Sequence, residues 1–279
     1  MSLVKVKGTY DVLPNESSKW QALEAHVRKL FSTYNYKEIR TPMMEHSDVF
    51  HRDNELSDMV TKETYNFSDR SGRMLTLRPE GTAGGVRSYI ENKLYANNEL
   101  EKLYYIGPNF RYERPQKGRF RQFMQFGIEA LGSESPYLDA EVIMLAYDVI
   151  KSRGLKGVNV KVNSLGDEAS KKTYFETLRT YFSPHKETLC SDCQARIEKN
   201  PLRILDCKID KDHPAVVAAP SPFDHLSAES KTYIETVLKT LDTANIPYQL
   251  APRLVRGLDY YSQTVFEIEA DIEGFGAQN

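Results

Sequence analysis

Two strand-like segments joined by a short loop constrain the fold of this chain more than any other feature. They are LEKLYYIGPNFRYE (100–113) and FRQFMQFGIEALG (120–132), and the loop between them is RPQKGR. Gly118 suits a tight turn, because glycine takes backbone conformations that other residues avoid. Two strand patterns separated by so few residues predict a long antiparallel hairpin.

The second strand presents two different faces, because successive side chains of a strand point to opposite sides. One face is mostly apolar and is expected to pack on the core: Phe120, Gln122, Met124, Phe126, Ile128 and Ala130. The other face consists of Arg121, Phe123, Gln125, Gly127 and Glu129. A polar strand face commonly faces solvent. However, a glycine inside a strand often marks the close approach of a ligand, and Phe123 is unusual on a wetted face.

Positive charge is concentrated around the loop. FRYERPQKGRFRQF (110–123) holds five basic side chains and one acid, whereas the chain of 279 residues has a net charge of −2. Clustered arginines of this kind suit phosphate, which the planar guanidinium binds through two parallel hydrogen bonds. Phe123 offers a ring on which a base can stack. Antiparallel pairing would place Arg111 beside the Gln125 and Glu129 face, so the hairpin is predicted to bind a nucleotide and a small polar group.

The remaining patterns predict an α+β fold. Helices are expected at 15–34, at 82–94 with Thr82 as its cap, and at 137–152, and strands at 36–42, 73–82, 157–166 and 254–270. Residues 167–249 are rich in helix-forming residues. We therefore expect a core over 1–166, a helical insertion over 167–249 and a return to the core over 250–279.

Composition narrows the class of protein further. The hydrophobic fraction of 40% and the charged fraction of 27% are those of a globular protein. No apolar run approaches the roughly 18 residues of a membrane span, and the first residues lack a signal-peptide core. Three cysteines give no disulfide framework. We expect a cytoplasmic protein that does not enter a membrane.

Cys190 and Cys193, with Cys207 further on, admit two interpretations. A C-x-x-C spacing is compatible with a structural zinc site, whereas free cysteines are usually small buried hydrophobic residues. Because no second pair of cysteines follows, we expect buried cysteines and no metal.

At this point the motifs resemble a known family. FRYERPQKGRFRQF is similar to motif 2 of histidyl-tRNA synthetases, which are class II aminoacyl-tRNA synthetases. GTYDVLP, YKEIRTPMMEHSDVF, LTLRPEGTA and LVRGLDYYSQTVFEI resemble further motifs of that family in the same order. The resemblance covers essentially the whole chain. It implies a class II antiparallel sheet flanked by helices, with a mainly helical insertion.

The resemblance also implies a reaction. The histidine carboxylate attacks the α-phosphorus of ATP to give histidyl-adenylate and pyrophosphate, and a ribose hydroxyl of tRNA(His) then takes the histidyl group. No protein nucleophile is needed, so catalysis consists of positioning and charge neutralisation. ATP is a substrate here, and class II sites commonly use Mg²⁺ on its phosphates.

Roles in ATP binding follow from the resemblance, residue by residue. It implies that Arg111 and Arg256 hold the α-phosphate as the catalytic pair and that Glu113 meets the adenine amino group. Arg119 would reach the γ-phosphate, and Phe123 would stack on adenine.

Roles in histidine binding follow in the same way. The resemblance implies that Glu80 and Thr82 meet the α-amino group, with Gln125 close to the same substrate. Glu129 and Tyr261 would contact the imidazole, because a carboxylate and a phenol can pair with its two nitrogens.

The family pattern also bears on assembly and completeness. Motif 1 of class II enzymes usually lies at a dimer interface, so a homodimer is expected. After GFGAQN the family would continue with motif 3 and an anticodon-binding domain. On that basis the chain is expected to be a fragment with an open sheet edge and little or no aminoacylation activity.

Two other interpretations compete with a ligase. One is the synthetase-like regulatory subunit of ATP phosphoribosyltransferase, which lacks an anticodon domain and is not itself a catalyst. The other is a tRNA-sensing domain with a dead site. Arg111, Glu113, Arg119, Gln125 and Arg256 are all present, which favours the ligase, because a protein freed from adenylation has little chemical reason to keep them.

Overall fold

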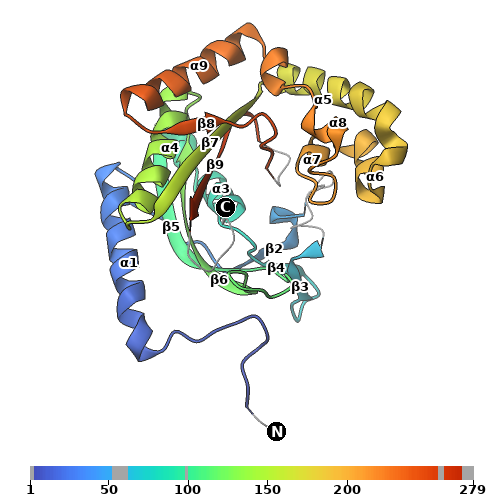
Figure 1. Ribbon diagram of the computed structural model, residues 1–279. Coiled ribbons are helices and arrows are strands. Elements are labelled where there is room, and N and C mark those ends of the chain that lie inside the picture. The colour runs from blue at the N-terminus through green and yellow to red at the C-terminus, as the bar shows by residue number, and fades with distance from the viewer. Residues whose placement is uncertain (1–2, 52–61, 98–99, 257–260, 272–279) are drawn as a thin grey trace. The chain divides into compact units, whose positions relative to one another are not determined.

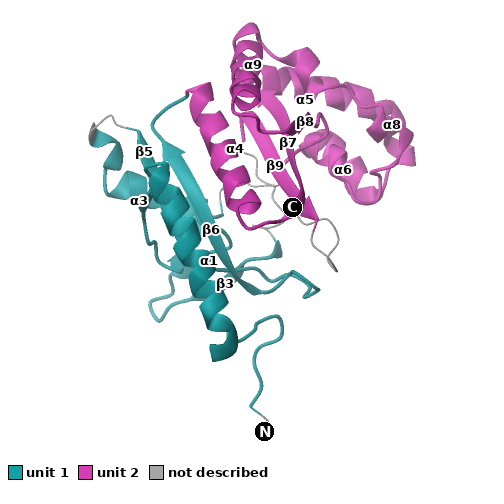
Figure 2. Ribbon diagram, turned by 60° about the vertical axis from the view of Figure 1, so that its left-hand side comes forward, with its two compact units in different colours: residues 1–134 teal, residues 135–279 magenta. Residues whose placement is uncertain are grey.

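The structure is a computed structural model that describes residues 3–51, 62–97, 100–256 and 261–271. The chain divides into two compact units, Met1–Glu134 and Ser135–Asn279, shown in teal and magenta in Figure 2. Each unit is described by itself.

The described residues of the first unit form two three-stranded sheets with the orders β1-β5-β6 and β2-β4-β3. Its elements are α1 (Pro14–Thr33), β1 (Lys37–Glu38), β2 (Met44–His46), η1 (Ser47–Val49), β3 (Tyr65–Ser68), β4 (Met74–Leu77), α3 (Thr82–Glu91), η2 (Leu94–Asn97), β5 (Glu101–Phe110) and β6 (Gln122–Leu131). β1 pairs with β5 in parallel, and every other strand pairing among the described residues of this unit is antiparallel.

The predicted hairpin is confirmed. β5 and β6 pair in antiparallel register from Glu101↔Leu131 to Phe110↔Gln122 without a bulge. The loop closes through a bridge between Gln116 and Arg119, with Gly118 at φ +82°. That conformation favours glycine, which explains the residue at this position.

α1 covers one face of the hairpin through ring contacts. The Phe31 ring lies 5.1 Å from that of Tyr104 and 6.1 Å from that of Phe126, between centroids. Met124 and Phe126 nevertheless remain 38% and 39% exposed. The prediction that the whole apolar face of β6 packs into the core is therefore wrong at these residues. A single helix is too narrow to cover a face of this length.

The described part of the second unit is built on one three-stranded sheet, β8-β7-β9. Its elements are α4 (Pro136–Lys151), β7 (Lys156–Gly166), α5 (Glu168–Phe182), η3 (Ser183–Thr188), α6 (Ser191–Lys199), α7 (Leu202–Leu205), α8 (Pro214–Val217), η4 (Pro222–His225), α9 (Ala228–Thr243), β8 (Tyr248–Leu250) and β9 (Gln263–Asp271). The run of helices expected between 167 and 249 is present, while the division into three domains stays a prediction.

Two apolar cores organise this unit. α4 and α9 pack on Val160 and Val162 of β7 and on Phe266 of β9 (Figure 1). Val265 lies in the second core, which gathers the buried side chains of α5, α6, α7 and α8. Because Val265 and Phe266 are neighbours in one strand, the two cores lie on opposite faces of the sheet.

Two predicted strands are shorter in the structure than in the sequence pattern. The strand expected at 36–42 is confined to Lys37–Glu38, because only these residues pair with β5 before Pro42. The strand expected at 254–270 begins at Gln263. Residues 257–260 of the LVRGLDYY motif lie outside the described residues.

No described helix combines the length and hydropathy needed to cross a membrane.

Candidate functional site

The candidate site lies on the face of the β5–β6 hairpin opposite α1. We call this surface the site face: Tyr105, Gly107 and Asn109 of β5, continued by Arg111, with Phe123, Gln125, Gly127 and Glu129 of β6. Asn109 is only 2% exposed and Tyr105 is buried. The polar face is thus more buried than the apolar face, so the solvent-facing interpretation is wrong.

Glu129 is the centre of the first part of the site face. The Tyr105 hydroxyl donates to Glu129 Oε1 at 3.3 Å, and the Thr82 side chain also hydrogen-bonds this carboxylate. Burial, supported by the nearby charge of Glu80, raises the pKa of Glu129 to about 7, despite these two hydrogen bonds. The ionised form of this carboxyl group is unfavourable in the free protein, so a bound cation or N–H donor would stabilise it.

Glu80 organises the start of α3 beside this carboxylate. Its two oxygens accept the backbone N–H groups of Thr82 at 2.5 Å and of Ala83 at 2.8 Å. Thr82 was expected to cap the helix, but it is the first helical residue and its side chain turns to Glu129. The cap is the Glu80 carboxylate, whose negative charge also suits a helix N-terminus.

Tyr105 is a site residue that the sequence patterns missed. A Cβ added at Gly127 or at Gly81 would collide with the Tyr105 ring. Gly127 was expected to make room for a ligand, whereas the structure shows that it makes room for this tyrosine. The signal was the register: Tyr105 pairs directly with Gly127, and an aromatic residue opposite a glycine fills the space that the glycine leaves.

The second part of the site face is basic and aromatic. The Arg111 guanidinium carbon lies 5.2 Å from the centre of the Phe123 ring, and Arg111 Nε donates to the Pro79 carbonyl at 2.9 Å. Burial lowers the pKa of Arg111 below its ordinary value, while Glu113 is the largest opposing influence. Arginine stays charged in proteins, so a fixed, partly desolvated cation faces the site.

Glu113 and Arg119 form an ion pair at the rim. Arg119 Nη1 lies 3.2 Å from Glu113 Oε2, and their side chains are 50% and 15% exposed. Ion pairs of such exposure contribute about 0.2–1 kcal/mol. A ligand can therefore separate Glu113 from Arg119 at little cost.

Gln125 lies between the acidic and basic parts. Asn109 Nδ2 donates to Gln125 Oε1. Since the amide oxygen is used, the Gln125 NH₂ group is left as a donor. Asn109 was not predicted as a site residue, although it faces Phe123 directly in the register.

Arg256 and Tyr261 belong to the second unit. Arg256 Nη1 pairs with Glu267 Oε1 at 2.9 Å, and its backbone carbonyl accepts from Arg203 at 3.5 Å. Tyr261 packs against the α5–α8 core, and its carbonyl accepts from Lys171 at 3.2 Å. The common site that the family pattern implies for these two residues and the site face stays a prediction.

The three cysteines converge in the structure. Cys193 and Cys207 are buried, as expected, and Cys190 is partly buried. Asp210 joins them, and one ligand atom of each of the four residues lies within 4.8 Å of all the others. The sequence analysis missed Asp210, although its position three residues after Cys207 repeats the C-x-x-C spacing.

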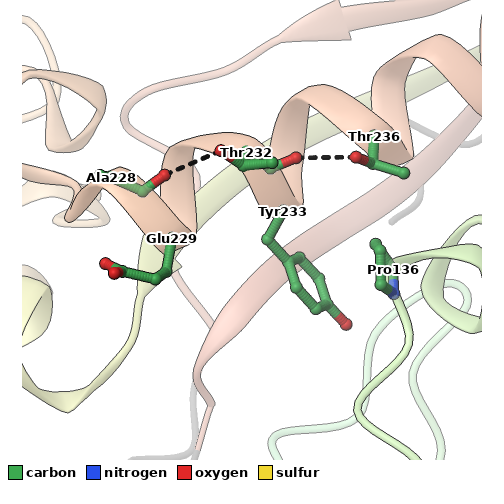
Figure 3. Close-up of a pocket in the computed structure, with 6 residues that line it drawn as sticks. All are labelled: Pro136, Ala228, Glu229, Thr232, Tyr233 and Thr236. Atoms are coloured by element: carbon green, nitrogen blue, oxygen red, sulfur yellow. Dashed lines mark hydrogen bonds between the residues drawn. The ribbon is translucent and has the colours of Figure 1, made fainter.

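A surface hollow of about 470 Å³ in the second unit is chemically poor. Figure 3 shows that it lies beside α9, with Tyr233 extending toward Pro136. The hydroxyls of Thr232 and Thr236 donate to the backbone carbonyls one turn earlier at 3.0 and 2.8 Å. Both hydroxyl hydrogens are therefore used within α9, and Glu229 is the charged side chain that lines this hollow.

Taken together, the site face carries charges of both signs. The Glu129 carboxylate lies toward one end, and the cations Arg111 and Arg119 lie toward the other, with Gln125 between. Glu80 acts electrostatically on both Glu129 and Arg111, and the buried Arg78 guanidinium lies over Gly107 of the same face. Strand rise separates Gln125 from Glu129 by about 14 Å. Such a surface suits a cationic ligand beside an anionic one.

Known proteins match the chain over almost its whole length. A family model described as histidyl-tRNA synthetase matches residues 8–274. The histidine–tRNA ligases of Acholeplasma laidlawii and Bacillus subtilis 168 are 63% and 55% identical, over 100% and 97% of this chain. The chain spans 66% and 64% of the lengths of these two relatives.

Solved structures give the same fold. The apo histidyl-tRNA synthetase of S. aureus matches with a TM-score of 0.78 and 44% identity, over 98% of this chain and 63% of that one. A Bacillus halodurans protein titled as an ATP phosphoribosyltransferase regulatory subunit/histidyl-tRNA synthetase matches with a TM-score of 0.69, over 97% of this chain and 74% of that one. At 18% identity that likeness shows the fold alone.

The fold is that of the class II aminoacyl-tRNA synthetases, with antiparallel strands flanked by helices. Within that class, the chain belongs to the histidyl-tRNA synthetase family.

Proposed function

We propose that this chain supplies the histidine- and ATP-binding face of a histidine–tRNA ligase. The observation that carries the proposal is the separation of the Glu129 carboxylate from the Arg111 and Arg119 guanidinium groups along the site face, because the two substrates of the first step differ in charge in the same way. Histidine brings an α-ammonium group and an imidazole, while ATP brings a triphosphate.

Histidine binds at the acidic end in this proposal. The α-ammonium group meets Glu80, which has acceptor sites beyond the two N–H groups it already receives. An imidazole N–H meets Glu129, whose carboxylate is held by Tyr105 and Thr82. The free NH₂ of Gln125 is directed to the histidine carboxylate. Buried polar groups of this kind reject analogues that lack the matching N–H.

ATP binds at the basic end. Arg111 takes the α-phosphate with its terminal guanidinium nitrogens, because its Nε is engaged by the Pro79 carbonyl. Since the guanidinium lies over one side of the Phe123 ring, adenine stacks on the other side. Glu113 accepts from the adenine amino group and Arg119 takes the γ-phosphate, so ATP replaces their ion pair.

The chemical step then needs only position and charge. A histidine carboxylate oxygen attacks the α-phosphorus, the bond to the bridging oxygen breaks, and pyrophosphate leaves. Negative charge grows on the non-bridging oxygens, where Arg111 stabilises it, and Arg256 is proposed as the second cation. A ribose hydroxyl of the terminal adenosine of tRNA(His) then attacks the activated carbonyl and releases AMP.

Metal and assembly complete the proposal. The described residues of the site face offer no group of three or more carboxylate, histidine or cysteine ligands, so they do not form a magnesium cage. We propose that Mg²⁺ arrives with the triphosphate, whose oxygens can supply several of its ligands. We also propose a homodimer that acts in the cytoplasm, where tRNA is charged. The exposed side chains of Met43 and Met44 in the motif 1 segment support an interface there.

Histidine-dependent ATP–pyrophosphate exchange tests this function. Arg111→Lys keeps the charge but loses the forked geometry, and it should lower the exchange rate about 10²–10³-fold. Arg114→Lys is the matched control, because Arg114 is an exposed loop residue outside the site face. Equal exchange rates in the two variants, or exchange that does not require histidine, would contradict the proposal.

The regulatory-subunit interpretation has weaker support. Relatives named histidine–tRNA ligase reach 63% identity, whereas the structure whose title mentions a regulatory subunit reaches 18%.

A further inference from the structure

We propose that Cys190, Cys193, Cys207 and Asp210 bind one structural Zn²⁺ ion in the helical part of the second unit. The site is independent of the site face and of the reaction proposed there. It joins the start of α6 to the turn that follows α7 (Figure 1).

The spacing of the four residues is that of two short metal-binding turns. Cys190-Ser-Asp-Cys193 supplies one pair, and Cys207-Lys-Ile-Asp210 supplies the other. Two pairs with two residues inside each is the arrangement of structural zinc sites, and three thiolates with one carboxylate are suitable zinc ligands. The sequence-based expectation of no metal was drawn because no matching second pair of cysteines follows, and a pair completed by an aspartate was not considered.

The distances agree with tetrahedral coordination. Zn–S bonds of about 2.3 Å place two sulfurs of a tetrahedron about 3.8 Å apart. Cys190 Sγ and Cys207 Sγ are 3.7 Å apart, and all four candidate ligand atoms fall within 4.8 Å of one another. These two sulfurs come from different turns. Their proximity is therefore a result of the fold and not of the local sequence spacing.

Backbone N–H groups already surround the ligand atoms as they do around bound metals. Asp210 N lies 3.5 Å from Cys207 Sγ, and the Ile209 and Cys193 N–H groups also donate to Cys207 and Cys190 sulfurs. Cys190 N–H donates to the Asp210 carboxylate at 3.0 Å. Donors to the ligands orient them and stabilise their charged forms.

The burial and contacts of Asp210 give the second argument. Asp210 is 7% exposed, and it accepts hydrogen bonds from the Cys190 N–H group and from the Cys190 and Cys193 thiols. These contacts hold the carboxylate against the sulfurs, where one divalent ion would be shared by all four ligands. Arg196, which lies beside Cys193 and Cys207, offsets the negative charge left by four anionic ligands.

A structural role follows from the ligand count. Four protein ligands fill a tetrahedral zinc site and leave no position for water or substrate. Cys193 and Cys207 belong to the same core as the helices around them. The ion would therefore hold α6 and the α7–α8 connection together from inside that core.

The experiment measures metal directly in the purified protein. After reduction, loading with Zn²⁺ and removal of free metal, the parent should retain one zinc per chain by elemental analysis. Cobalt in place of zinc should give the visible bands of tetrahedral coordination with a thiolate-to-cobalt charge-transfer band. Cys193→Ser should lose stoichiometric retention, and Asp210→Asn should weaken zinc binding at least tenfold.

A control and a second measurement guard against misfolding. Asp212→Asn removes an exposed acid next to the site and should retain zinc like the parent. If Cys193→Ser does not fold, the cobalt spectrum of the parent and the zinc affinity of Asp210→Asn still show whether the four residues bind metal. A parent that retains less than a tenth of an equivalent of zinc overturns the proposal, and so does an Asp210→Asn variant that binds zinc as tightly as the parent.

Discussion

Glu129 links the stability of the chain to its proposed function at the scale of single residues. Its carboxyl group is held by Tyr105 and Thr82 in a setting where burial is the dominant influence. A site that must receive a cation commonly stores such an unfavourable charge in the free protein. The consequence is a measurable dependence of stability on pH.

We predict that Glu129→Gln stabilises the protein at pH 8 and not at pH 4. The pKa of Glu129 is about 7 when folded and about 4.3 when unfolded. Below the unfolded pKa, Glu129 therefore does not lower the free energy of unfolding. As the pH rises from there through 7, ionisation of Glu129 lowers this free energy. The loss is on the order of 3 kcal/mol. Glutamine accepts the same hydrogen bonds without this charge.

Denaturant unfolding at the two pH values measures the effect. Glu134→Gln serves as the control, because Glu134 is exposed after the end of β6, and it should change stability little at either pH. Equal stability of the parent and Glu129→Gln at pH 8 would contradict the burial argument.

Gly127 gives a second prediction at this scale. A methyl group at this position meets the Tyr105 ring, so Gly127→Ala should destabilise the protein by about 1–3 kcal/mol. Gly85→Ala in α3 places its methyl group 3.7 Å from Glu129 Cγ, an ordinary contact. That variant should gain about 0.5–1 kcal/mol from helix propensity. Thermal unfolding of both variants should show opposite signs, and equal signs would refute the packing account.

At the scale of elements, the N-terminus of α3 has both a structural role and a proposed role in histidine recognition. Glu80 accepts two backbone N–H groups there and is also proposed to meet the histidine ammonium. Glu80→Ala removes the cap and should cost about 0.5–2 kcal/mol of stability. Glu80→Gln keeps an acceptor oxygen and should cost less, yet it should weaken histidine binding as strongly as Glu80→Ala. Unfolding and histidine binding, measured on both variants, distinguish the capping role of Glu80 from its role in recognition. Full histidine affinity in Glu80→Gln would exclude the recognition role.

The hairpin also shows what sequence can predict about an element. Period-2 alternation placed Phe123, Gln125 and Glu129 on one face, and the register confirms this. Alternation does not state which face is buried, because that depends on what packs against the strand. α1 leaves Met124 and Phe126 partly exposed, while polar contacts bury the site face.

The candidate site was predictable only where its residues lie close in a motif. Arg111, Glu113, Arg119 and Phe123 belong to one hairpin and come together as expected. Tyr105 and Asn109 were missed, because their roles arise from pairing with Gly127 and from contact with Gln125. Asp210 was missed because a C-x-x-D spacing is a weak signal until the fold brings Asp210 to Cys190, 20 residues away.

At the scale of the whole molecule, the proposed homodimer predicts a particle of about twice the chain mass of 32.0 kDa. Met44 is 53% exposed on β2, where the motif 1 interface is proposed. Met44→Lys should therefore weaken association, because an interface core excludes charge. Light scattering coupled to size-exclusion chromatography measures the mass of the parent and of Met44→Lys in solution. A parent that stays monomeric at micromolar concentration would contradict the dimer.

The site face of the hairpin is the central claim, and histidine binding by calorimetry tests it most directly. The parent should bind histidine with one site per chain, Glu129→Gln should bind at least tenfold more weakly, and Glu134→Gln should bind like the parent. Affinities that are equal in the parent and Glu129→Gln, or a parent that binds no histidine, would contradict the account.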